Sequence, residues 1–353
     1  MTEILVEGRR IGEGHSTFII AELSANHLQQ FDLAVATVKA AKESGADAIK
    51  LQTYTPDTLT LNCDAPLFRT DKAPLWAGQT LYQLYEQAYT PWEWQPKLKA
   101  IAEELGLICF STPFDLTAVA FLEEMDVPCY KIASCELVDI GLIEAAARHG
   151  KPMILSTGIA TLEEIEEAVA ACRRVGNRQI ALLKCATCDY PTPMAETHLR
   201  QIPDLMRRFN VPVGISDHSL GSTTAIAAVA LGGTIIEKHF ILHRGLGGPD
   251  AAFSMEPHEF AALVQAVRDT EQALGSCSYA HSEAVTRHRH YRRSLFVTQD
   301  IAAGETLTSA NVRSIRPGSG LPPKHLPELL GRRANTAISR GTPLTWDLVA
   351  TDA

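Results

Sequence analysis

The sequence contains no apolar run near the roughly 18 residues that a membrane-spanning helix needs, although 46% of its 353 residues are hydrophobic. This combination predicts a large buried core and no membrane partner. The first residues, MTEILVEGRRIGEG, lack the apolar core of a signal peptide, so we expect a cytoplasmic protein. An excess of basic residues is also missing. The 32 Lys and Arg against 41 Asp and Glu give a net charge of −9, which argues against nucleic acid as a partner.

Two further motifs are missing or incomplete. No G-x-G-x-x-G follows the first expected strand, which counts against a dinucleotide-binding fold. The 8 cysteines are scattered through apolar segments such as LICFS and PCYKI, so we expect reduced, buried thiols. Cys185 and Cys188 form a CxxC pair, but no second pair and no matching histidine pair follows at the spacing of a zinc site. A metal or redox role for this pair remains the alternative to two structural thiols.

Short apolar segments recur along the chain, and each is followed by a helical pattern. Near-continuous apolar strands are typical of parallel sheets that are buried on both faces. One of the helical stretches begins with Thr161 and carries Glu164 three residues later, which predicts a capping box. This alternation predicts an α/β fold, a (β/α)8 TIM barrel. The expected strands are FIIAEL (18–23), AIKLQT (48–53), LICFST (107–112), CYKIAS (129–134), PMILST (152–157), IALLKCA (180–186), VPVGISDH (211–218) and TIIEKHF (234–240).

The domain organisation follows from a change of character after the helix EPHEFAALVQAVRDTEQALG. We assign residues 1–280 to the barrel, with an extra hairpin or helix over one rim within residues 54–106. Residues 281–293 are expected to form a linker that includes the basic stretch TRHRHYRR, for which anion binding or an interface is the alternative. Residues 294–353 are expected to form a small β-rich domain. So small a domain has a marginal core of its own, so we expect it to lean on the barrel or on a partner subunit.

Polar side chains stand at the end of almost every expected strand. Because barrel active sites lie at the C-terminal ends of the strands, we expect these side chains to converge. Taken singly, each histidine or lysine has a structural interpretation, but a whole ring of such groups in a concave site costs desolvation unless a ligand completes it. The ring comprises Glu22, Ser24, Asn26, His27, Lys50, Gln52, Ser111, Thr112, Lys131, Ser134, Glu136, Ser156, Thr157, Lys184, Tyr190, Asp217, His218, Glu237, Lys238 and His239.

These residue types suggest a specific chemistry. Lysines and hydroxyls are suited to a phosphate or carboxylate group. Two histidines, His218 and His239, beside carboxylates are suited to a divalent metal that keeps open positions and acts as a Lewis acid on a carbonyl. An activated carbonyl beside an anionic phosphate ligand suggests carbon–carbon bond formation with a phosphorylated nucleophile. The residues alone lead no further.

Several of the same segments resemble a known family. FIIAELSANH, AIKLQTY, FSTPFD, YKIASCE, STGIATLEEIE, GISDHSLG, IIEKHF and GGPDAAFSMEP are similar to the sialic acid synthase family. RRSLFV, AGETLT and VRSIRPGSGLPP resemble its C-terminal antifreeze-like domain, the SAF domain with a β-clip fold. The resemblance covers essentially the whole chain, with the motifs in the family's order. KLQTYTPDT, YTPWEW and GGPDAAFSMEP look most like the branch that makes pseudaminic acid.

The resemblance implies an enzyme of nonulosonic acid biosynthesis. Such a transferase condenses phosphoenolpyruvate with the open-chain aldehyde of an N-acylated deoxy sugar and releases phosphate. For this branch the sugar is 2,4-diacetamido-2,4,6-trideoxy-L-altrose. The resemblance also implies Mn²⁺ or Mg²⁺ as cofactor and a domain-swapped homodimer. The alternatives are an N-acetylneuraminate or legionaminic acid synthase, a class I aldolase or lyase with a Schiff base on Lys131 or Lys184, and a non-catalytic sugar-binding barrel.

Motif matching assigns a role to individual residues. Glu22 corresponds to the family glutamate near the reacting carbons, and His218 and His239 correspond to its metal ligands and are counted with Glu22 as catalytic. Arg316 corresponds to the arginine that the SAF domain brings to the sugar of the partner subunit. The expected phosphoenolpyruvate-binding residues are Lys50, Thr112, Lys131, Ser134, Ser156 and Ser216. The expected sugar contacts are Gln52, Glu136, Tyr190, Asp250 and Arg316.

The sequence departs from the family pattern in two places. Tyr190 stands five residues after Cys185 instead of four, so we expect either a bulge or altered contacts there. A phosphate contact that is Asn or Ser in the family could be replaced by Thr187 or Cys188. After Asn26 and His27 the chain reads Leu-Gln-Gln, where the sialic branch has Asn-Gly or Glu-Gly. The second departure favours a sugar other than N-acetylmannosamine.

Overall fold

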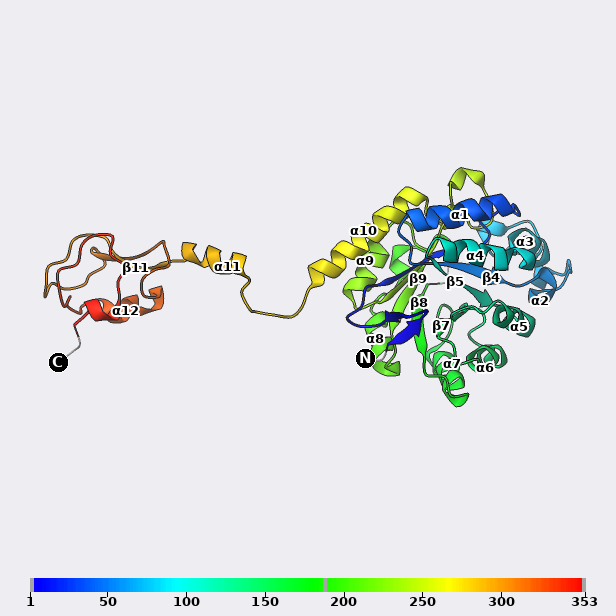
Figure 1. The fold of residues 1–353 in the computed structure, drawn as a ribbon, viewed down its shortest axis with the longest axis horizontal. Coiled ribbons are helices and arrows are strands. Elements are labelled where there is room, and N and C mark those ends of the chain that lie inside the picture. Colours follow the sequence, from blue (N-terminus) through cyan, green and yellow to red (C-terminus); the bar gives the residue numbers. More distant parts are fainter. Residues whose placement is uncertain (1–2, 187–188, 351–353) are drawn as a thin grey trace. The chain divides into compact units, whose positions relative to one another are not determined.

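A closed barrel of eight parallel strands forms the centre of the larger part of the chain, in a computed structural model that describes residues 3–186 and 189–350. The predicted (β/α)8 fold is confirmed (Figure 1). Each strand lies within the segment predicted for it or extends one residue past its end. The strands are β3 (Phe18–Glu22), β4 (Ala48–Thr53), β5 (Ile108–Pro113), β6 (Tyr130–Ile132), β7 (Met153–Ser156), β8 (Ile180–Cys185), β9 (Val213–Asp217) and β10 (Ile235–His239).

Helices surround the strands on the outside of the barrel (Figure 1). Their apolar faces pack on the strands to form one continuous core of buried Ile, Leu, Val, Ala and Phe side chains. The helices are α1 (Phe31–Glu43), α2 (Pro56–Leu59), α3 (Leu81–Ala88), α4 (Gln95–Glu104), α5 (Leu116–Glu124), α6 (Ile140–Ala147), α7 (Leu162–Arg174), α8 (Gln201–Phe209), α9 (Thr223–Ala230) and α10 (Pro257–Leu274). No helix in the described ranges has the length and apolarity to cross a bilayer.

Local sequence signals account for the ends of several elements. The predicted capping box at α7 is present, with the Thr161 side chain accepting from the Glu164 backbone and the Glu164 side chain accepting in return. At Gly214 in β9, an added Cβ would lie 2.1 Å from the carbonyl oxygen of Ile235 in β10. Only glycine allows this close approach, so Gly214 brings together the two strands that lead to His218 and His239.

A small hairpin covers the amino-terminal ends of the barrel strands. Its strands β1 (Ile4–Val6) and β2 (Arg9–Ile11) pair antiparallel and bury Ile4, Val6 and Ile11 in the barrel core. The guanidinium of Arg9 donates to Asp47, directly before β4, with 2.7 Å between Nη1 and Oδ1. The hairpin therefore closes one end of the barrel, and the opposite end carries the polar residues.

The segment between β4 and α4 is a local elaboration, as predicted for one rim. It contains α2, α3 and three short 3₁₀ turns: Pro66–Phe68, Pro74–Trp76 and Trp92–Trp94. An isolated bridge joins Arg69 to Thr80 and holds the base of its long loop. Capping boxes at Thr55 and Thr80 begin the two helices. This ordered segment, residues 54–94, supplies one wall of the pocket described below.

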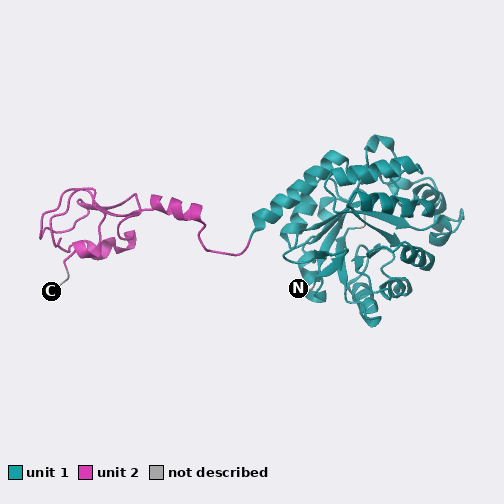
Figure 2. Ribbon diagram, viewed as in Figure 1, with its two compact units in different colours: residues 1–275 teal, residues 276–353 magenta. Residues whose placement is uncertain are grey.

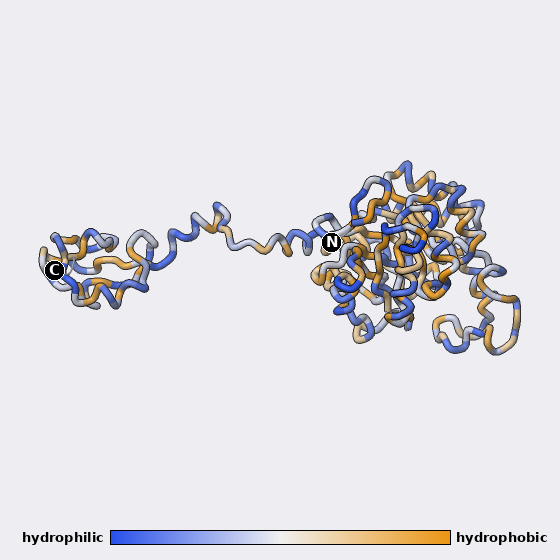
Figure 3. Tube along the Cα trace, turned by 90° about the horizontal axis from the view of Figure 1, so that it is seen from below, coloured by the Kyte–Doolittle hydropathy of each residue, from blue (hydrophilic) through white to orange (hydrophobic). Residues whose placement is uncertain are grey.

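The chain divides into two compact units, residues 1–275 and 276–353 (Figure 2). The second begins with a hydrophilic stretch that contains the short helix α11 (Glu283–His288), drawn mainly in blue in Figure 3. Beyond it, β11 (Ser294–Val297) pairs antiparallel with β12 (Val312–Ile315), and isolated bridges continue the β structure. A short helix, α12 (Leu326–Leu329), packs its buried Leu329 on a separate small core.

Candidate functional site

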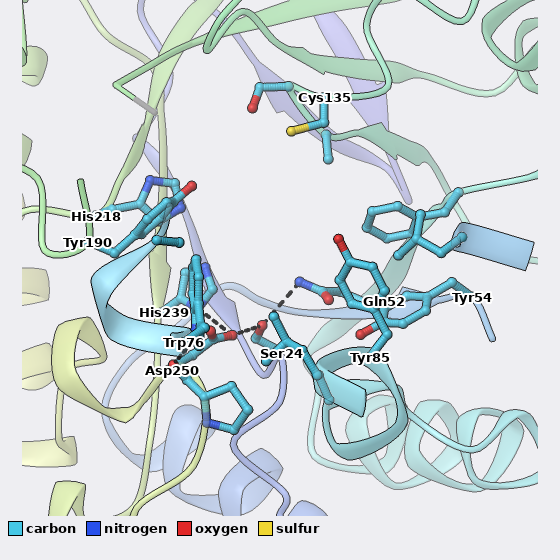
Figure 4. A pocket seen from close by; sticks show the side chains of 18 of the residues that line it. Ser24, Gln52, Tyr54, Trp76, Tyr85, Cys135, Tyr190, His218, His239 and Asp250 are labelled. Carbon is cyan, nitrogen blue, oxygen red and sulfur yellow. Dashed lines mark hydrogen bonds and ion pairs between the residues drawn. The ribbon is translucent and has the colours of Figure 1, made fainter. Parts of the chain in front are cut away.

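A pocket of about 470 Å³ lies at the carboxyl ends of the barrel strands. Figure 4 shows it from close by, with His218, Tyr190, Trp76 and His239 on one side and Tyr54 and Tyr85 on the other. The residues that line it come from all eight barrel strands or the loops directly after them, and from the elaborated segment. They include Ser24, Lys50, Gln52, Tyr54, Trp76, Tyr85, Phe114, Lys131, Ser134, Glu136, Ser156, Tyr190, Ser216, His218, Glu237, His239, Asp250 and Phe253.

Two lysines from different strands meet at one carboxylate on the floor of this pocket. The Glu237 Oε1 atom lies 3.3 Å from Lys131 Nζ and 3.7 Å from Lys50 Nζ. Ser216 donates to the same oxygen at 3.0 Å. Lys50 also pairs with Glu22 and donates to the Thr112 hydroxyl at 3.2 Å. All these side chains are buried, so the floor is a charged network inside the barrel mouth.

The charges of the floor are set by burial and by mutual pairing. Burial opposes ionisation of Glu237, but Lys131 and Lys50 outweigh it and lower its pKa. Burial and the neighbouring Glu237 raise the pKa of Glu22 to about 7, although Lys50 acts in the opposite direction. Burial lowers the pKa of Lys131, while the pKa of Lys50 is raised because its carboxylate partners outweigh burial. Two ammonium groups and two carboxylates, Glu237 and Glu22, therefore share the floor, and the ammonium groups can donate charge-assisted hydrogen bonds to an anionic ligand.

Two histidines stand above this floor, because side chains alternate along a strand. Ser216 and His218 of the β9 segment face the pocket, as do Glu237 and His239 of β10. The imidazole centroids of His218 and His239 lie 5.2 Å apart. Burial lowers the pKa of His218 to about 4 and holds that of His239 well below its usual value. Both rings are therefore neutral and able to donate a lone pair.

The intervening residues of the same strands point the other way. Lys238 is fully buried, its Nζ lies 2.7 Å from Asp217 Oδ2, and it donates to the Ser219 carbonyl. Asp217 also accepts from the backbone and hydroxyl of Ser219. This pair does not line the pocket. The two opposite charges neutralise each other behind the site, so the role of this pair is structural. Of the charged and histidine side chains at these two strand ends, only His218, Glu237 and His239 face the pocket.

A chain of polar contacts forms the side of the pocket below Trp76. Gln52 donates to the Ser24 hydroxyl at 3.1 Å, and Ser24 donates to a carboxylate oxygen of Asp250 (Figure 4). His239 also lies close to Asp250, with 3.7 Å between its Nδ1 and Asp250 Oδ2. Trp76 covers this corner, held by a 2.8 Å hydrogen bond from its Nε1 to the Pro249 carbonyl. The arrangement can orient hydroxyl or amide groups of a ligand next to the histidines.

The structure brings most of the predicted site residues to one pocket. Those that line it are Lys50, Gln52, Lys131, Ser134, Glu136, Ser156, Tyr190, Ser216, His218, His239 and Asp250. Glu22 and Thr112 lie one layer deeper, where both contact Lys50. Arg316 belongs to the second unit. Thr187 and Cys188, named as substitutes for a phosphate contact and as part of the CxxC pair, fall outside the described residues.

Tyr190 lines the pocket despite the extra residue that precedes it. Its ring packs on His218, with centroids 4.9 Å apart, on Phe253 at 5.0 Å and on Trp76 at 5.5 Å. Lys184, considered for a Schiff base, instead donates to the Cys185 carbonyl at 2.7 Å and lines a separate cavity beside β8. Of the two lysines considered for that chemistry, Lys131 faces the pocket.

Sequence reasoning assigned no role to several pocket residues. Glu237 was recognised as a strand-end acid, but its contact with both lysines follows from the barrel register. Phe253 lies in the quoted segment GGPDAAFSMEP and packs on both histidines, at centroid distances of 5.9 Å and 4.8 Å. Trp76, Tyr54 and Tyr85 come from or border the elaborated segment. No strand or helix periodicity indicates how far such a loop reaches.

The two histidines fit a divalent cation that keeps most of its coordination positions open. Both are neutral, and the buried Nδ1 of His239 makes no hydrogen bond. Within residues 3–186 and 189–350, no cluster of three or more His, Cys, Asp or Glu forms a complete ligand set. The protein would therefore supply two imidazoles, and solvent or substrate oxygens would supply the rest.

Two family models and several known proteins match most of this chain. Residues 37–279 match the NeuB family and residues 292–350 match the SAF domain. A pseudaminic acid synthase from Helicobacter pylori is 46% identical over 330 residues, which is 93% of this chain and 96% of that protein. An N,N'-diacetyllegionaminic acid synthase from Legionella pneumophila is 34% identical over 342 residues, 95% of each chain.

Solved structures of related proteins also match most of this chain. An N-acetylneuraminic acid synthetase from Leptospira borgpetersenii, in complex with citrate, has 32% identity and a TM-score of 0.73, over 81% of this chain and 95% of that chain. The spore coat polysaccharide biosynthesis protein SpsE from Bacillus subtilis has 31% identity and a TM-score of 0.67, over 100% of both chains.

Proposed function

The chain belongs to the NeuB family, and on this premise we propose that it condenses phosphoenolpyruvate with 2,4-diacetamido-2,4,6-trideoxy-L-altrose to give pseudaminic acid and phosphate. The carrying observation is the convergence of Lys50 and Lys131 on Glu237, beneath two neutral histidines. The higher identity to pseudaminic acid synthases, 46%, than to legionaminic acid synthases, 34%, supports this sugar over its stereoisomer.

Phosphoenolpyruvate is the ligand that the floor accommodates. Its phosphate and carboxylate would bind to the ammonium groups of Lys50 and Lys131, with the hydroxyls of Ser134, Ser156 and Ser216 as further donors. The buried Ser156 hydroxyl makes no hydrogen bond in the described structure, so a phosphate oxygen would complete it. Thr112 acts one layer below by orienting Lys50.

The reaction then joins C3 of phosphoenolpyruvate to C1 of the sugar. A Mn²⁺ or Mg²⁺ ion on His218 and His239, when bound, would polarise the sugar aldehyde. As C3 forms the new bond, positive charge develops at C2, and Glu22 stabilises that charge from beneath through its carboxylate. Water adds at C2, and the resulting hemiketal phosphate loses phosphate by C–O cleavage. Lys50 and Lys131 hold the anionic groups throughout.

The sugar is bound by side chains of the pocket wall and by an arginine of the second unit. Gln52, Glu136, Tyr190 and Asp250 contact the sugar from the pocket wall. Arg316 reaches the sugar from the SAF domain of a partner subunit, which makes the protein a domain-swapped homodimer. We place the enzyme in the cytoplasm, where phosphoenolpyruvate is made.

The test is phosphate release from phosphoenolpyruvate with Mn²⁺, with and without EDTA. Three sugars are compared: the diacetamido L-altrose compound, its D-mannose counterpart and N-acetylmannosamine. We expect release with the altrose sugar, and loss of release in EDTA. Release with another sugar alone would move the chain to the legionaminic or sialic branch. Turnover that resists EDTA and is trapped by borohydride would support the Schiff-base alternative on Lys131 instead, and no release at all would support a binding protein.

A further inference from the structure

One wall of the pocket has no part in the chemistry described so far. It is formed by Tyr54, Leu84, Tyr85 and Phe114, and is called here the aromatic wall. Tyr54 packs edge-on against Tyr85 and Phe114, with ring centroids 5.7 Å and 5.1 Å apart. Tyr54 and Leu84 are buried, so the wall is preformed. Figure 4 shows its tyrosines across the pocket from His218 and Tyr190.

The aromatic wall is apolar but carries a polar group. Tyr85 extends from α3 into the pocket (Figure 4), and no residue in the described ranges hydrogen-bonds its hydroxyl. Burial raises the pKa of Tyr85 to about 12, so the hydroxyl remains a neutral donor. The side-chain amide of Gln52 lies beside the two tyrosines and uses its NH₂ group on Ser24. Its oxygen is an acceptor that faces the same space.

A ligand group that matches this wall needs a carbonyl acceptor, an N–H donor and a small apolar end. An acetamido group has all three. We propose that the aromatic wall is the subsite for the acetamido group at C4 of the sugar, with the Tyr85 hydroxyl donating to its carbonyl, Gln52 accepting from its N–H, and its methyl against Leu84 and Phe114. This inference rests on the proposed function and names the feature of the substrate that the pocket selects.

The assignment of the aromatic wall to the C4 acetamido group, and not to the one at C2, follows from the length of the open-chain sugar. When the aldehyde C1 lies at His218 and His239, the substituent on C2 stays close to the histidines, whereas C4 lies farther along the open chain, toward the aromatic wall. The C6 methyl group is a weaker match, because it would bury the Tyr85 hydroxyl without a partner. Leaving a buried donor unpaired costs about 1–3 kcal/mol.

The experiment compares two sugars that differ only at C4. These are 2,4-diacetamido-2,4,6-trideoxy-L-altrose and 2-acetamido-2,6-dideoxy-L-altrose, which has a hydroxyl at C4. We expect Tyr85→Phe to lower kcat/KM about tenfold for the diacetamido sugar, the effect of one lost hydrogen bond. We expect a change below about twofold for the 4-hydroxy sugar and an unchanged KM for phosphoenolpyruvate. Leu84→Ala should act in the same direction through the lost methyl contact.

Tyr82→Phe is the matched control. Tyr82 lies on the same helix, but its hydroxyl donates to Asp57 outside the pocket, so this variant should behave like the wild type with both sugars. Equal losses on both sugars, or no loss in Tyr85→Phe and Leu84→Ala, overturn the subsite while phosphate release by the wild-type enzyme still supports the proposed function. If the wild type releases phosphate with neither sugar, the proposed function fails and the subsite fails with it.

Discussion

The Lys131 ammonium group lies 3.3 Å from a Glu237 carboxylate oxygen, and both side chains are almost completely buried. The two residues come from β6 and β10, which are not neighbours in the barrel, so the contact spans its interior. Lys50 approaches the same oxygen, so the two lysines that we propose to hold the anionic substrate meet at Glu237. The predictions below test the role proposed for Lys131 and the roles proposed for the other site residues.

Removing the charge of Lys131 should weaken the binding of phosphoenolpyruvate. We expect Lys131→Met to lower kcat/KM for phosphoenolpyruvate by roughly 100-fold, because one charge-assisted contact to the anion is lost. Steady-state phosphate release measures the change. Lys99→Met removes a lysine that pairs with Glu103 on the outer helix α4, and should leave kinetics unaltered. Normal kinetics in Lys131→Met would remove this residue from the substrate-binding set.

Removing an imidazole should abolish turnover and spare the fold. We expect His218→Ala to retain less than about 1% of wild-type activity, with a circular dichroism melting curve close to that of the wild type. Mn²⁺ binding, followed by electron paramagnetic resonance, should fall in parallel. The exposed His198 provides the control variant His198→Ala. Near-normal activity that still requires metal would exclude His218 as a ligand.

The raised pKa of Glu22 gives a pH dependence with a definite sign. Burial and Glu237 raise this pKa to about 7, so the carboxylate loses its charge as the pH falls through 7. We expect kcat/KM to decrease below that pH, because a neutral Glu22 cannot stabilise positive charge at C2. A pH–rate profile of Glu22→Gln should be low and flat.

Glu136 requires a separate control, because burial raises its pKa to about 7 as well. The variant Glu136→Gln should keep the decrease at low pH while binding the sugar less tightly. A flat profile in Glu136→Gln, with the decrease retained in Glu22→Gln, would transfer the titration to Glu136.

The buried pair behind the site should affect stability. Asp217→Asn leaves Lys238 charged and fully buried, and we expect it to lower the free energy of unfolding by about 3–5 kcal/mol. Lys238→Met should have a similar effect. The double variant should lose much less than the sum, because no unpaired charge remains. Urea denaturation monitored by fluorescence measures all three. Additive losses would mean that the two side chains do not act as a pair.

The proposed role of Arg316 in a domain-swapped homodimer can be tested by mixing two inactive variants. If Arg316 serves the partner's barrel, a heterodimer of Arg316→Ala and His218→Ala subunits contains one site with every group intact. We expect mixing to restore activity up to about half of the wild-type value per heterodimer. If Arg316 serves its own barrel, both sites of the heterodimer are defective and mixing restores nothing.

The sequence predicts the strands of the barrel well because buried parallel strands are near-continuous in apolar residues. The eight expected segments each contain a barrel strand, and side-chain alternation explains why His218 and Glu237 face inward while Asp217 and Lys238 face outward. The capping box at Thr161 could also be read directly. These features depend on local spacing, which a sequence displays.

The pocket walls depend on long-range packing, and here the sequence is less informative. Trp76 reaches the pocket because its indole hydrogen-bonds to Pro249, 173 positions away. The contact of Glu237 with Lys131 likewise requires the closed barrel, which brings β10 and β6 together across its interior. Family resemblance supplied the roles expected of Gln52 and Asp250, but the contact of Tyr85 with Tyr54 comes from the folded chain alone.

The hairpin of β1 and β2 has a consequence for the route by which substrates reach the pocket. The barrel interior is filled by buried side chains and the hairpin covers its amino-terminal end, so both proposed substrates would enter through the pocket at the carboxyl ends of the strands. The two lysines that we propose to bind phosphoenolpyruvate are buried, whereas the residues that we propose to contact the sugar are partly exposed: Gln52, Glu136, Tyr190 and Asp250. On this proposal a sugar that bound first would block the path to the lysines, so we expect phosphoenolpyruvate to bind before the sugar and phosphate to leave after the newly made acid.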